Sequence, residues 1–291
     1  MITLFLMSKK GLKSLQSVID NNLSNQIDKV VSSRDSSVSK DYYKEIKDLC
    51  QKNNILFYDK GENFKVESEY VFAISWRWML DCDKSNLIVF HDSLLPKYRG
   101  FNPLVSCLLN REKKIGVTAL FASEEFDTGP IISQSSSTIT YPIKLDQAID
   151  VICENYSDLC IEIIKKIKSK TKLNAKPQNN SDVSYSVWRD EEDYKIDWSK
   201  SAEDICSIID SLGYPYLGAS CHIQSQKVRI LEAEVYENLL VENRSPGKLL
   251  LKKGDFPVII CGKGLLLIKK AVYDESRESI FPLKKFRIRF S

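Results

Sequence analysis

Short apolar runs alternate with amphipathic, helix-length segments through the first half of this chain of 291 residues. Brief apolar runs beside turn residues are typical of buried strands, and apolar positions about three to four residues apart are typical of helices. Because strands that alternate with helices build βαβ units, the pattern predicts an α/β domain with a mainly parallel sheet. The predicted strands lie at residues 2–6, 30–31, 55–58, 70–74, 87–90, 115–121 and 131–138, and the predicted helices at 12–19, 40–52, 103–109 and 146–168.

The second half has a different pattern. A polar stretch at residues 169–184 interrupts the periodic segments and indicates a domain boundary. Beyond it we expect one helix, capped by Ser199 or Ser201 and ending near Leu212. Strand-like segments separated by glycine-containing turns fill the rest, at 222–235, 247–252, 256–261 and 265–272. We therefore predict two domains, one at 1–175 and a small β-rich, barrel-like one at 185–291.

Composition narrows the function. The 42 basic and 39 acidic residues give a net charge of +3, which is too balanced to indicate a nucleic-acid partner. The eight cysteines form no CxxC pair, which argues against a zinc site, and no other metal is indicated. A GxGxxG motif is absent, so the nucleotide-binding fingerprint of dinucleotide enzymes is missing. With no apolar run long enough for a membrane helix and no signal-like N-terminus, we expect a cytoplasmic protein without a membrane partner.

Histidine is scarce, because only His91 and His222 are present. His91 follows the predicted strand at 87–90, and ligands of open α/β sheets bind at the carboxyl ends of the strands. An imidazole there serves either as an acid–base group or as a structural group that hydrogen-bonds to the backbone, and the residue alone does not decide between them.

Asp127 stands in a Gly/Pro turn between two predicted strands. A carboxylate at that place could orient an imidazole and raise its pKa, which suits a general base. Asp is equally common as a plain turn residue before Thr-Gly, so this reading also stays open.

A longer motif surrounds these two residues. Residues 93–100 read Ser-Leu-Leu-Pro-Lys-Tyr-Arg-Gly, residues 116–118 read Gly-Val-Thr, and His91 precedes Asp127 by 36 positions. Together they resemble the formyltransferases that use 10-formyltetrahydrofolate, over roughly residues 1–170. Looser matches at 196–198 and 214–219 extend the resemblance to the C-terminal domain of that family. The resemblance implies a Rossmann-like formyltransferase domain followed by an OB-like barrel.

The resemblance also implies roles for individual residues. His91 would act as general base or proton shuttle, and Asp127 would hold and polarise its ring. Arg99 is expected to be structural and to pair with a carboxylate. The 10-formyltetrahydrofolate site would be lined on one side by Ser75, Trp76, Arg77 and Trp78, and on the other by Glu125 and Asp127. In the alternative reading, both tryptophans pack in the core and Arg77 lies on the surface.

One position departs from the family pattern. Val89 stands where the family has an Asn two residues before the histidine, whose amide stabilises the oxyanion. Loss of one such donor costs a rate factor of about 100 or more. The substitute could be Ser75, Ser93, Thr118 or a backbone N–H, and a folate-binding pseudo-enzyme is the alternative.

Three acceptors fit the resemblance. The acidic and basic residues of 185–291 are close in number, and residues 190–193 read Asp-Glu-Glu-Asp, which disfavours a tRNA backbone. We therefore expect an N-formyltransferase acting on a nucleotide-linked amino sugar, with a methionyl-tRNA formyltransferase as the alternative. Formylation of glycinamide ribonucleotide normally needs only the first domain, so the second domain argues against this third acceptor. The balanced charge argues against an RNA-binding role for the barrel. The expected partners are folate and the sugar nucleotide, and a homodimer is left open.

Overall fold

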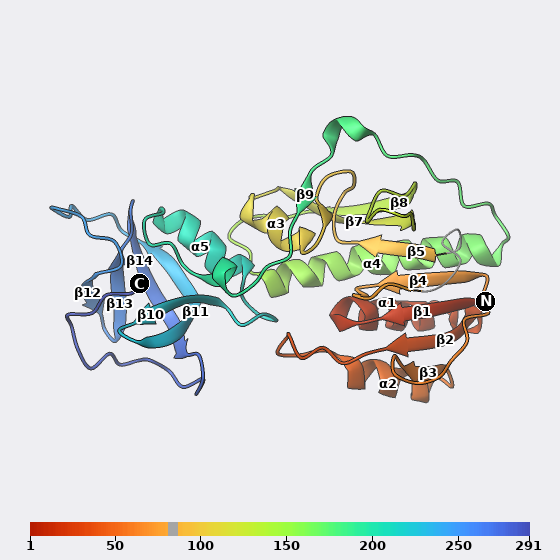
Figure 1. Cartoon of the computed structure of the whole chain (residues 1–291), viewed down its shortest axis with the longest axis horizontal. Helices are drawn as coiled ribbons and strands as arrows, with labels where there is room; N and C mark the ends of the chain where they lie inside the picture. The colour runs from red at the N-terminus through yellow and green to blue at the C-terminus, as the bar shows by residue number, and fades with distance from the viewer. Residues whose placement is uncertain (81–86) are drawn as a thin grey trace. The chain divides into compact units, whose positions relative to one another are not determined.

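The computed structural model describes residues 1–80 and 87–291, and the chain forms two compact units (Figure 1). Unit 1 comprises Met1–Thr140 and Gln147–Trp188, and unit 2 comprises Tyr141–Asp146 and Arg189–Ser291. The division into domains at 1–175 and 185–291 remains a prediction. Within the described part of the chain, helices that combine the length and apolar character of a membrane span are absent.

A seven-stranded sheet forms the centre of unit 1, in the order β3-β2-β1-β4-β5-β7-β8. The five strands from β3 to β5 are parallel, whereas β7 is antiparallel to both β5 and β8. This confirms the mainly parallel sheet. The strands are β1 (Ile2–Leu6), β2 (Ile27–Ser32), β3 (Leu56–Asp59), β4 (Tyr70–Ile74), β5 (Leu87–His91), β7 (Lys114–Phe121) and β8 (Ile131–Thr138). The strand order reverses direction between β1 and β4, which is where open α/β sheets hold their ligands.

Helices cover one face of this sheet. The long helix α4 lies along β5 and β8, since Tyr156 donates to the Phe90 carbonyl and Asn155 donates to Ser135. Helix α1 contacts α2 and is tied to α4 by an ion pair between Lys9 and Asp150. The helices are α1 (Ser8–Asp20), α2 (Tyr43–Lys52), α3 (Pro103–Leu109) and α4 (Leu145–Lys168), with short 3-10 turns η1 (Ser24–Gln26) and η2 (Asn180–Asp182).

The opposite face of the sheet is covered differently. Its buried side chains, which include Phe5, Val31 and Ala73, pack against residues of the segments that precede and follow β4, such as Phe64 and Trp76. Side chains from the carboxyl end of β4 therefore lie next to the sheet on the side away from the helices.

The polar stretch at 169–184 belongs to unit 1. Residues 176–186, which we call the strap, pair with other parts of unit 1. Lys176 pairs with Ile131, and β9 (Tyr185–Ser186) pairs in parallel with β6 (Arg99–Gly100). Figure 1 shows the green strap passing from the end of α4 to β9. Because β6 belongs to the loop that follows His91, the strap is part of the surroundings of the candidate site.

Unit 2 is built on a five-stranded antiparallel sheet in the order β10-β11-β14-β13-β12. Where the sequence predicts one strand at 222–235, the structure has the hairpin of β10 and β11. The elements are β10 (Ala219–Ile223), β11 (Gln226–Tyr236), β12 (Leu249–Lys253), β13 (Phe256–Ile260) and β14 (Leu265–Tyr273), with η3 (Glu192–Tyr194) and α5 (Ala202–Ser211). Ser201 caps α5 by accepting from the Asp204 N–H.

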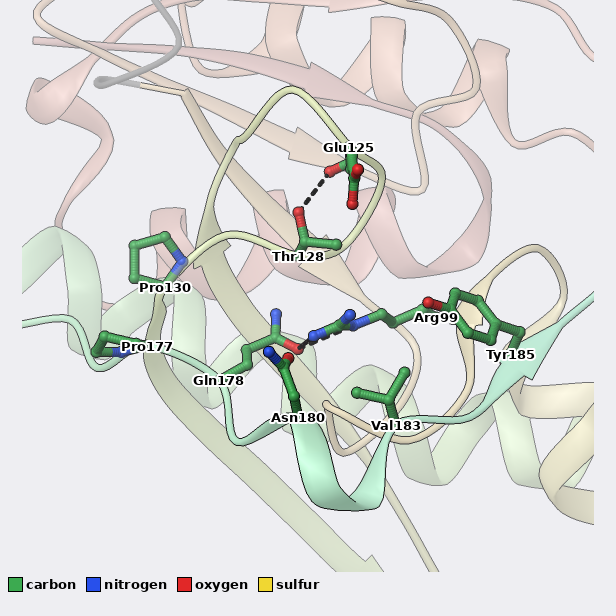
Figure 2. A pocket seen from close by; sticks show the side chains of 9 residues that line it. All are labelled: Arg99, Glu125, Thr128, Pro130, Pro177, Gln178, Asn180, Val183 and Tyr185. Atoms are coloured by element: carbon green, nitrogen blue, oxygen red, sulfur yellow. Dashed lines mark hydrogen bonds between the residues drawn. The ribbon is translucent and has the colours of Figure 1, made fainter.

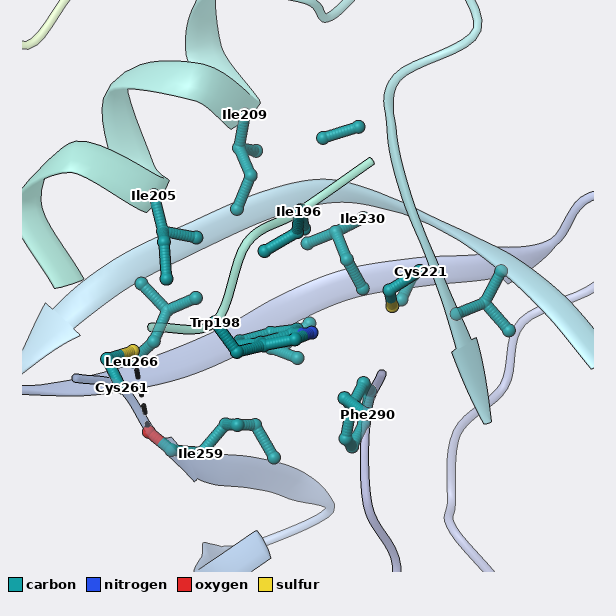
Figure 3. Packing of buried hydrophobic residues seen from close by; sticks show 14 of the residues in the cluster. Ile196, Trp198, Ile205, Ile209, Cys221, Ile230, Ile259, Cys261, Leu266 and Phe290 are labelled. Carbon is teal, nitrogen blue, oxygen red and sulfur yellow. Dashed lines mark hydrogen bonds between the residues drawn. The ribbon is translucent and has the colours of Figure 1, made fainter. Parts of the chain in front are cut away.

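The last residues of the chain close this sheet. The Ser291 N–H donates to the His222 carbonyl at the β10 edge, and the Leu249 N–H of β12 donates to the Ile288 carbonyl. Residues 288–291 thus join the two edge strands, and the result is a small barrel as predicted. Figure 3 shows its core, in which Trp198 and Phe290 pack with isoleucines of α5.

Candidate active site

His91 is the last residue of β5, and its ring is held at both nitrogens. Nε2 lies 2.8 Å from the Tyr98 carbonyl oxygen, and Nδ1 lies 3.3 Å from Oδ1 of Asp127. The side chain is only 8% exposed, so few waters compete for these contacts. The structure therefore brings together the two residues that the resemblance to the formyltransferases pairs.

The two contacts define where protons sit. A carbonyl oxygen can only accept, so Nε2 must carry a hydrogen and donate to Tyr98. Nδ1 then holds the lone pair in a neutral ring, and it faces a carboxylate oxygen that also only accepts. A proton placed between Nδ1 and Oδ1 turns this contact into a charge-assisted hydrogen bond. The geometry therefore places a ring nitrogen of His91 directly against a carboxylate oxygen of Asp127.

The carboxylate of Asp127 is fixed by its turn. Its backbone has φ of +58°, a left-handed conformation that is costly for a residue with a side chain. Oδ2 accepts from the Gly100 N–H at 2.8 Å, which orients Oδ1 toward His91. A Cβ on Gly129 would meet the Phe121 carbonyl oxygen at 1.8 Å, so only glycine lets this turn approach β7.

Gln178 of the strap secures the same turn from behind. Its Nε2 donates to the carbonyls of Asp127 and Gly129, at 2.7 and 2.8 Å. Its Oε1 accepts from Nε and Nη2 of Arg99, at 3.1 and 2.7 Å. Arg99, which is 6% exposed, was expected to pair with a carboxylate, but its partner is this amide. The expectation that Arg99 is structural fits the contact, whereas the expected kind of partner was wrong.

A cavity of about 670 Å³ lies beside this cross-link. Figure 2 shows Gln178 and Arg99 meeting within it, with Thr128 and Glu125 of the turn on the opposite side. The Glu125 side chain is exposed, and its backbone carbonyl accepts from Ser123 and Thr128 within its own loop. No hydrogen bond joins Glu125 to residues 75–78 among the residues that the structure describes.

Residues 75–78, which are expected to line one side of the formyl-donor site, directly follow β4, and β4 is paired with β5. Trp76 is half-buried and packs edge-on against Phe5 and Trp78, each at a ring distance of 5.0 Å. Trp78 is 37% exposed, and Lys60 Nζ lies 4.0 Å from its ring centre. Arg77 is exposed and pairs with Asp35 at 2.9 Å. Trp76 thus joins the core, as the alternative reading held, whereas Trp78 keeps a ring surface for solvent or a ligand.

The hydroxyl groups that could replace the missing Asn as a hydrogen-bond donor differ in the hydrogen bonds that they already make. Thr118, which is fully buried, donates to the Ser93 carbonyl, and Ser93, 1% exposed, donates to the Lys97 carbonyl. Ser75 is half-buried and accepts from the Ser8 hydroxyl at 3.0 Å. Val89 itself packs against the apolar cluster of Phe5 and Ala73.

Asp92, which directly follows His91, belongs to a half-buried polar cluster that the sequence did not reveal. Asp92 forms an ion pair with Lys10 and accepts from the Tyr156 hydroxyl. Burial, and next the Asp92 charge, hold the pKa of Tyr156 well above its usual range, so its phenol stays protonated and donating. The cluster fixes the end of β5 and hence the start of the loop after His91.

Sequence reasoning missed Gln178 and the Tyr98 carbonyl. Neither has a side-chain signature, since one lies in a polar stretch without periodicity and the other acts through its backbone. Burial, and the hydrogen bond to Glu112, raise the pKa of the Tyr98 phenol to about 12 against the opposing effect of Asn110, so its ring is an anchor for the loop. His222 lies in unit 2, on β10.

Comparison with known proteins gives matches in sequence and in fold. The family model described as "Formyl transferase" matches residues 76–153, and that described as "Formyl transferase, C-terminal domain" matches residues 189–279. A methionyl-tRNA formyltransferase of Thermodesulfovibrio yellowstonii is 30% identical over 230 residues, which cover 76% of this chain and 71% of the relative.

Solved structures share the fold. An N-formyltransferase from Helicobacter canadensis, in complex with folinic acid and dTDP-3-aminofucose, has a TM-score of 0.67 at 19% identity, covering 92% of this chain and 98% of that one. A methionyl-tRNA formyltransferase from Clostridium thermocellum has a TM-score of 0.57 at 16% identity, covering 82% and 95%. Both domain models, their order along the chain and the matched relative lead to one conclusion: the chain belongs to the formyltransferase family, whose enzymes transfer formyl groups.

Proposed function

We propose that this protein transfers the formyl group of 10-formyltetrahydrofolate to the amine of a nucleotide-linked amino sugar. The observation that carries the proposal is the contact between His91 and Asp127, 3.3 Å apart at the carboxyl edge of the sheet. Amine formylation needs a group that removes a proton, and this pair is arranged to take up one.

The reaction balances without metal or redox chemistry. The amine nitrogen bonds to the formyl carbon, and the bond between that carbon and the donor nitrogen breaks. The amine loses one proton and the donor nitrogen gains one. The proton from the amine passes to the His91–Asp127 pair, while the Tyr98 carbonyl and the Gly100 N–H hold the two side chains in place.

The wall after β4 suits a flat, polar donor molecule. Trp78 offers a partly exposed ring for stacking, and the hydroxyl hydrogen of Ser75 is not used in any bond among the described residues. Nε1 of Trp76 is buried and has no hydrogen-bond partner among the residues that the structure describes. This costs free energy, which a bound acceptor group could offset. Arg77 supports this role less, because Asp35 already neutralises it.

Charge favours a sugar nucleotide over tRNA as the acceptor. Asp190, Glu192 and Asp193 are exposed on unit 2, and each would repel an RNA backbone. The similarity in fold to the Helicobacter canadensis enzyme supports the same choice. A methionyl-tRNA acceptor is the second candidate, because the matched relative of Thermodesulfovibrio yellowstonii has that name.

The test is an absorbance assay for tetrahydrofolate release from 10-formyltetrahydrofolate. The purified protein is offered a panel of nucleotide-linked amino sugars and, separately, initiator methionyl-tRNA, and the formylated product is identified by mass spectrometry. We expect turnover with at least one sugar nucleotide and none with the tRNA. The His91→Asn variant is the control for release that does not depend on the site.

Other outcomes have definite meanings. Turnover with the tRNA alone would replace the proposed acceptor by the second candidate. Folate binding without turnover on the whole panel would contradict the proposed enzyme and indicate a binding protein, in keeping with Val89 at the Asn position.

A further inference from the structure

Formyl transfer requires a hydrogen-bond donor that the His91–Asp127 pair does not supply. Attack on the formyl carbon moves negative charge onto the formyl oxygen, and a fixed donor at that oxygen is among the largest contributions to such reactions. Asp127 offers no hydrogen to that oxygen, and the Nε2–H of His91 is held by the Tyr98 carbonyl. The donor must therefore come from another residue near the end of β5.

Most nearby donors are already engaged. The hydroxyls of Ser93 and Thr118 are buried and donate to backbone carbonyls. The Gly100 N–H donates to Asp127. Val89, on the same strand as His91, has an apolar side chain within an apolar cluster. The donors of Ser93, Thr118 and Gly100 could reach a substrate only by breaking these contacts, and Val89 has no donor. Nε1 of Trp76 has no partner among the described residues, but it is fully buried and out of reach of a substrate unless its side chain moves.

Ser75 is the exception, and the sheet places it beside His91. Ile74, the last residue of β4, is paired with Phe90 of β5, so Ser75 directly follows β4 where His91 ends β5. Neighbouring strands lie about 4.8 Å apart, which brings the two positions together at the carboxyl edge. Ser75 is half-buried, so a ligand can reach it.

The Ser75 hydroxyl is also fixed in place. Ser8 donates to its oxygen at 3.0 Å, which leaves the hydrogen of Ser75 directed elsewhere and free of any partner among the described residues. The backbone at Ser75 has φ of +56°, a conformation that costs free energy and is typical of functional positions. A donor with a set position and an uncommitted hydrogen is what stabilisation of a developing charge requires.

We propose that the Ser75 hydroxyl donates a hydrogen bond to the formyl oxygen during transfer and so replaces the amide that Val89 cannot provide. This inference rests on the proposed function. It makes Ser75 a catalytic residue rather than only a part of the donor-binding wall.

The experiment compares Ser75→Ala with Ser8→Ala. Both variants remove the hydrogen bond between Ser8 and Ser75, but only the first removes the hydroxyl of Ser75 itself. We expect Ser75→Ala to lower kcat by about 100-fold with little change in KM for the formyl donor. Ser8→Ala should lose less, because it loosens the Ser75 hydroxyl without removing it. Equal losses in both variants would show a structural role and overturn the proposal.

A second readout does not depend on turnover. The infrared C=O stretch of ¹³C-formyl-labelled 10-formyl-5,8-dideazafolate is measured when bound to each protein. A hydrogen bond to the formyl oxygen lowers this frequency, so the wild type and Ser8→Ala should show a lower value than Ser75→Ala. Identical frequencies in all three proteins would contradict the proposal.

The two proposals fail in different ways. Absence of turnover in the wild type would reject the proposed function. Turnover in the wild type that Ser75→Ala leaves unchanged would reject only the role of Ser75.

Discussion

Oδ1 of Asp127 lies 3.3 Å from Nδ1 of His91, while its other carboxylate oxygen accepts the Gly100 N–H. The aspartate is thus held by the backbone on one side and faces the imidazole on the other. Since Tyr98 takes the opposite ring nitrogen, the imidazole cannot rotate to another partner without losing both contacts. The backbone therefore fixes the imidazole and the carboxylate against each other.

Neutralising Asp127 should therefore stop catalysis without unfolding the protein. Asp127→Asn keeps a side-chain oxygen and the size of the group but removes the charge that stabilises a protonated His91. We expect kcat to fall by at least about 100-fold, and His91→Asn to have a similar effect. The thermal midpoint, measured by circular dichroism, should change little in either variant. Near-wild-type rates in both variants would show that the pair takes no part in the reaction.

The strap should matter for both stability and rate through a single side chain. Gln178→Leu removes the acceptor of Arg99 and the donor to two carbonyls of the Asp127 turn. Because it leaves a buried guanidinium without this partner, we expect a loss of about 3 kcal/mol in the free energy of unfolding. We also expect a lower kcat, since the turn is held less firmly. Urea denaturation and the tetrahydrofolate assay measure the two effects.

Asn180→Leu is the matched control for that variant. Asn180 lies on the same strap and lines the same cavity, but its side chain makes no hydrogen bond among the described residues. It should stay close to the wild type in stability and rate. A loss as large as that of Gln178→Leu would mean that the cavity wall, and not the cross-link to Arg99, is responsible.

The sequence predicted the architecture well because buried strands and amphipathic helices leave periodic patterns. The strand at 70–74 has the predicted bounds, and the helix at 103–109 begins at Pro103 as expected. The resemblance to the formyltransferases also paired His91, which follows a predicted strand, with Asp127, which stands in a turn between two predicted strands. The strap was not predicted, because its role rests on single hydrogen bonds made by Gln178 and on backbone pairing with β6. Such contacts depend on the fold and leave no periodicity in a polar stretch.

In unit 2, Arg229 should anchor the barrel through two carboxylates. Its side chain is 1% exposed and donates to Asp274 at 2.6 Å and to Glu191 at 2.8 Å. Asp274→Asn leaves Glu191 as the single carboxylate beside a buried guanidinium, so it should lower the free energy of unfolding by about 2 kcal/mol near pH 7. Glu275→Gln, which changes an exposed neighbouring carboxylate, should have little effect.

The same pair should make stability sensitive to acid. The hydrogen bond from Arg229 holds the pKa of Asp274 below its ordinary value of 3.8. Its contribution is therefore fully present above that value and is lost as the pH falls through the lower pKa of the folded state. Urea midpoints between pH 2 and pH 7 should fall more steeply in acid for the wild type than for Asp274→Asn. Parallel curves would show that the carboxylate contributes no ionic stabilisation.

Asp210 on α5 should have the opposite pH dependence. Burial raises its pKa from 3.8 to about 6, with the charges of Glu232 and Asp146 adding to the rise and that of Lys144 opposing it. A carboxyl group whose folded pKa exceeds the unfolded value binds its proton more tightly when folded, so it destabilises the fold as pH rises from about 4 to about 6. Asp210→Asn removes this penalty. We expect the variant to be more stable than the wild type at pH 8, with a smaller gain at pH 4. The control is Asp255→Asn, at an exposed turn, which should leave the stability unchanged at both pH values. If Asp210→Asn raised the stability equally at pH 4 and pH 8, burial of the carboxyl group would not be the cause.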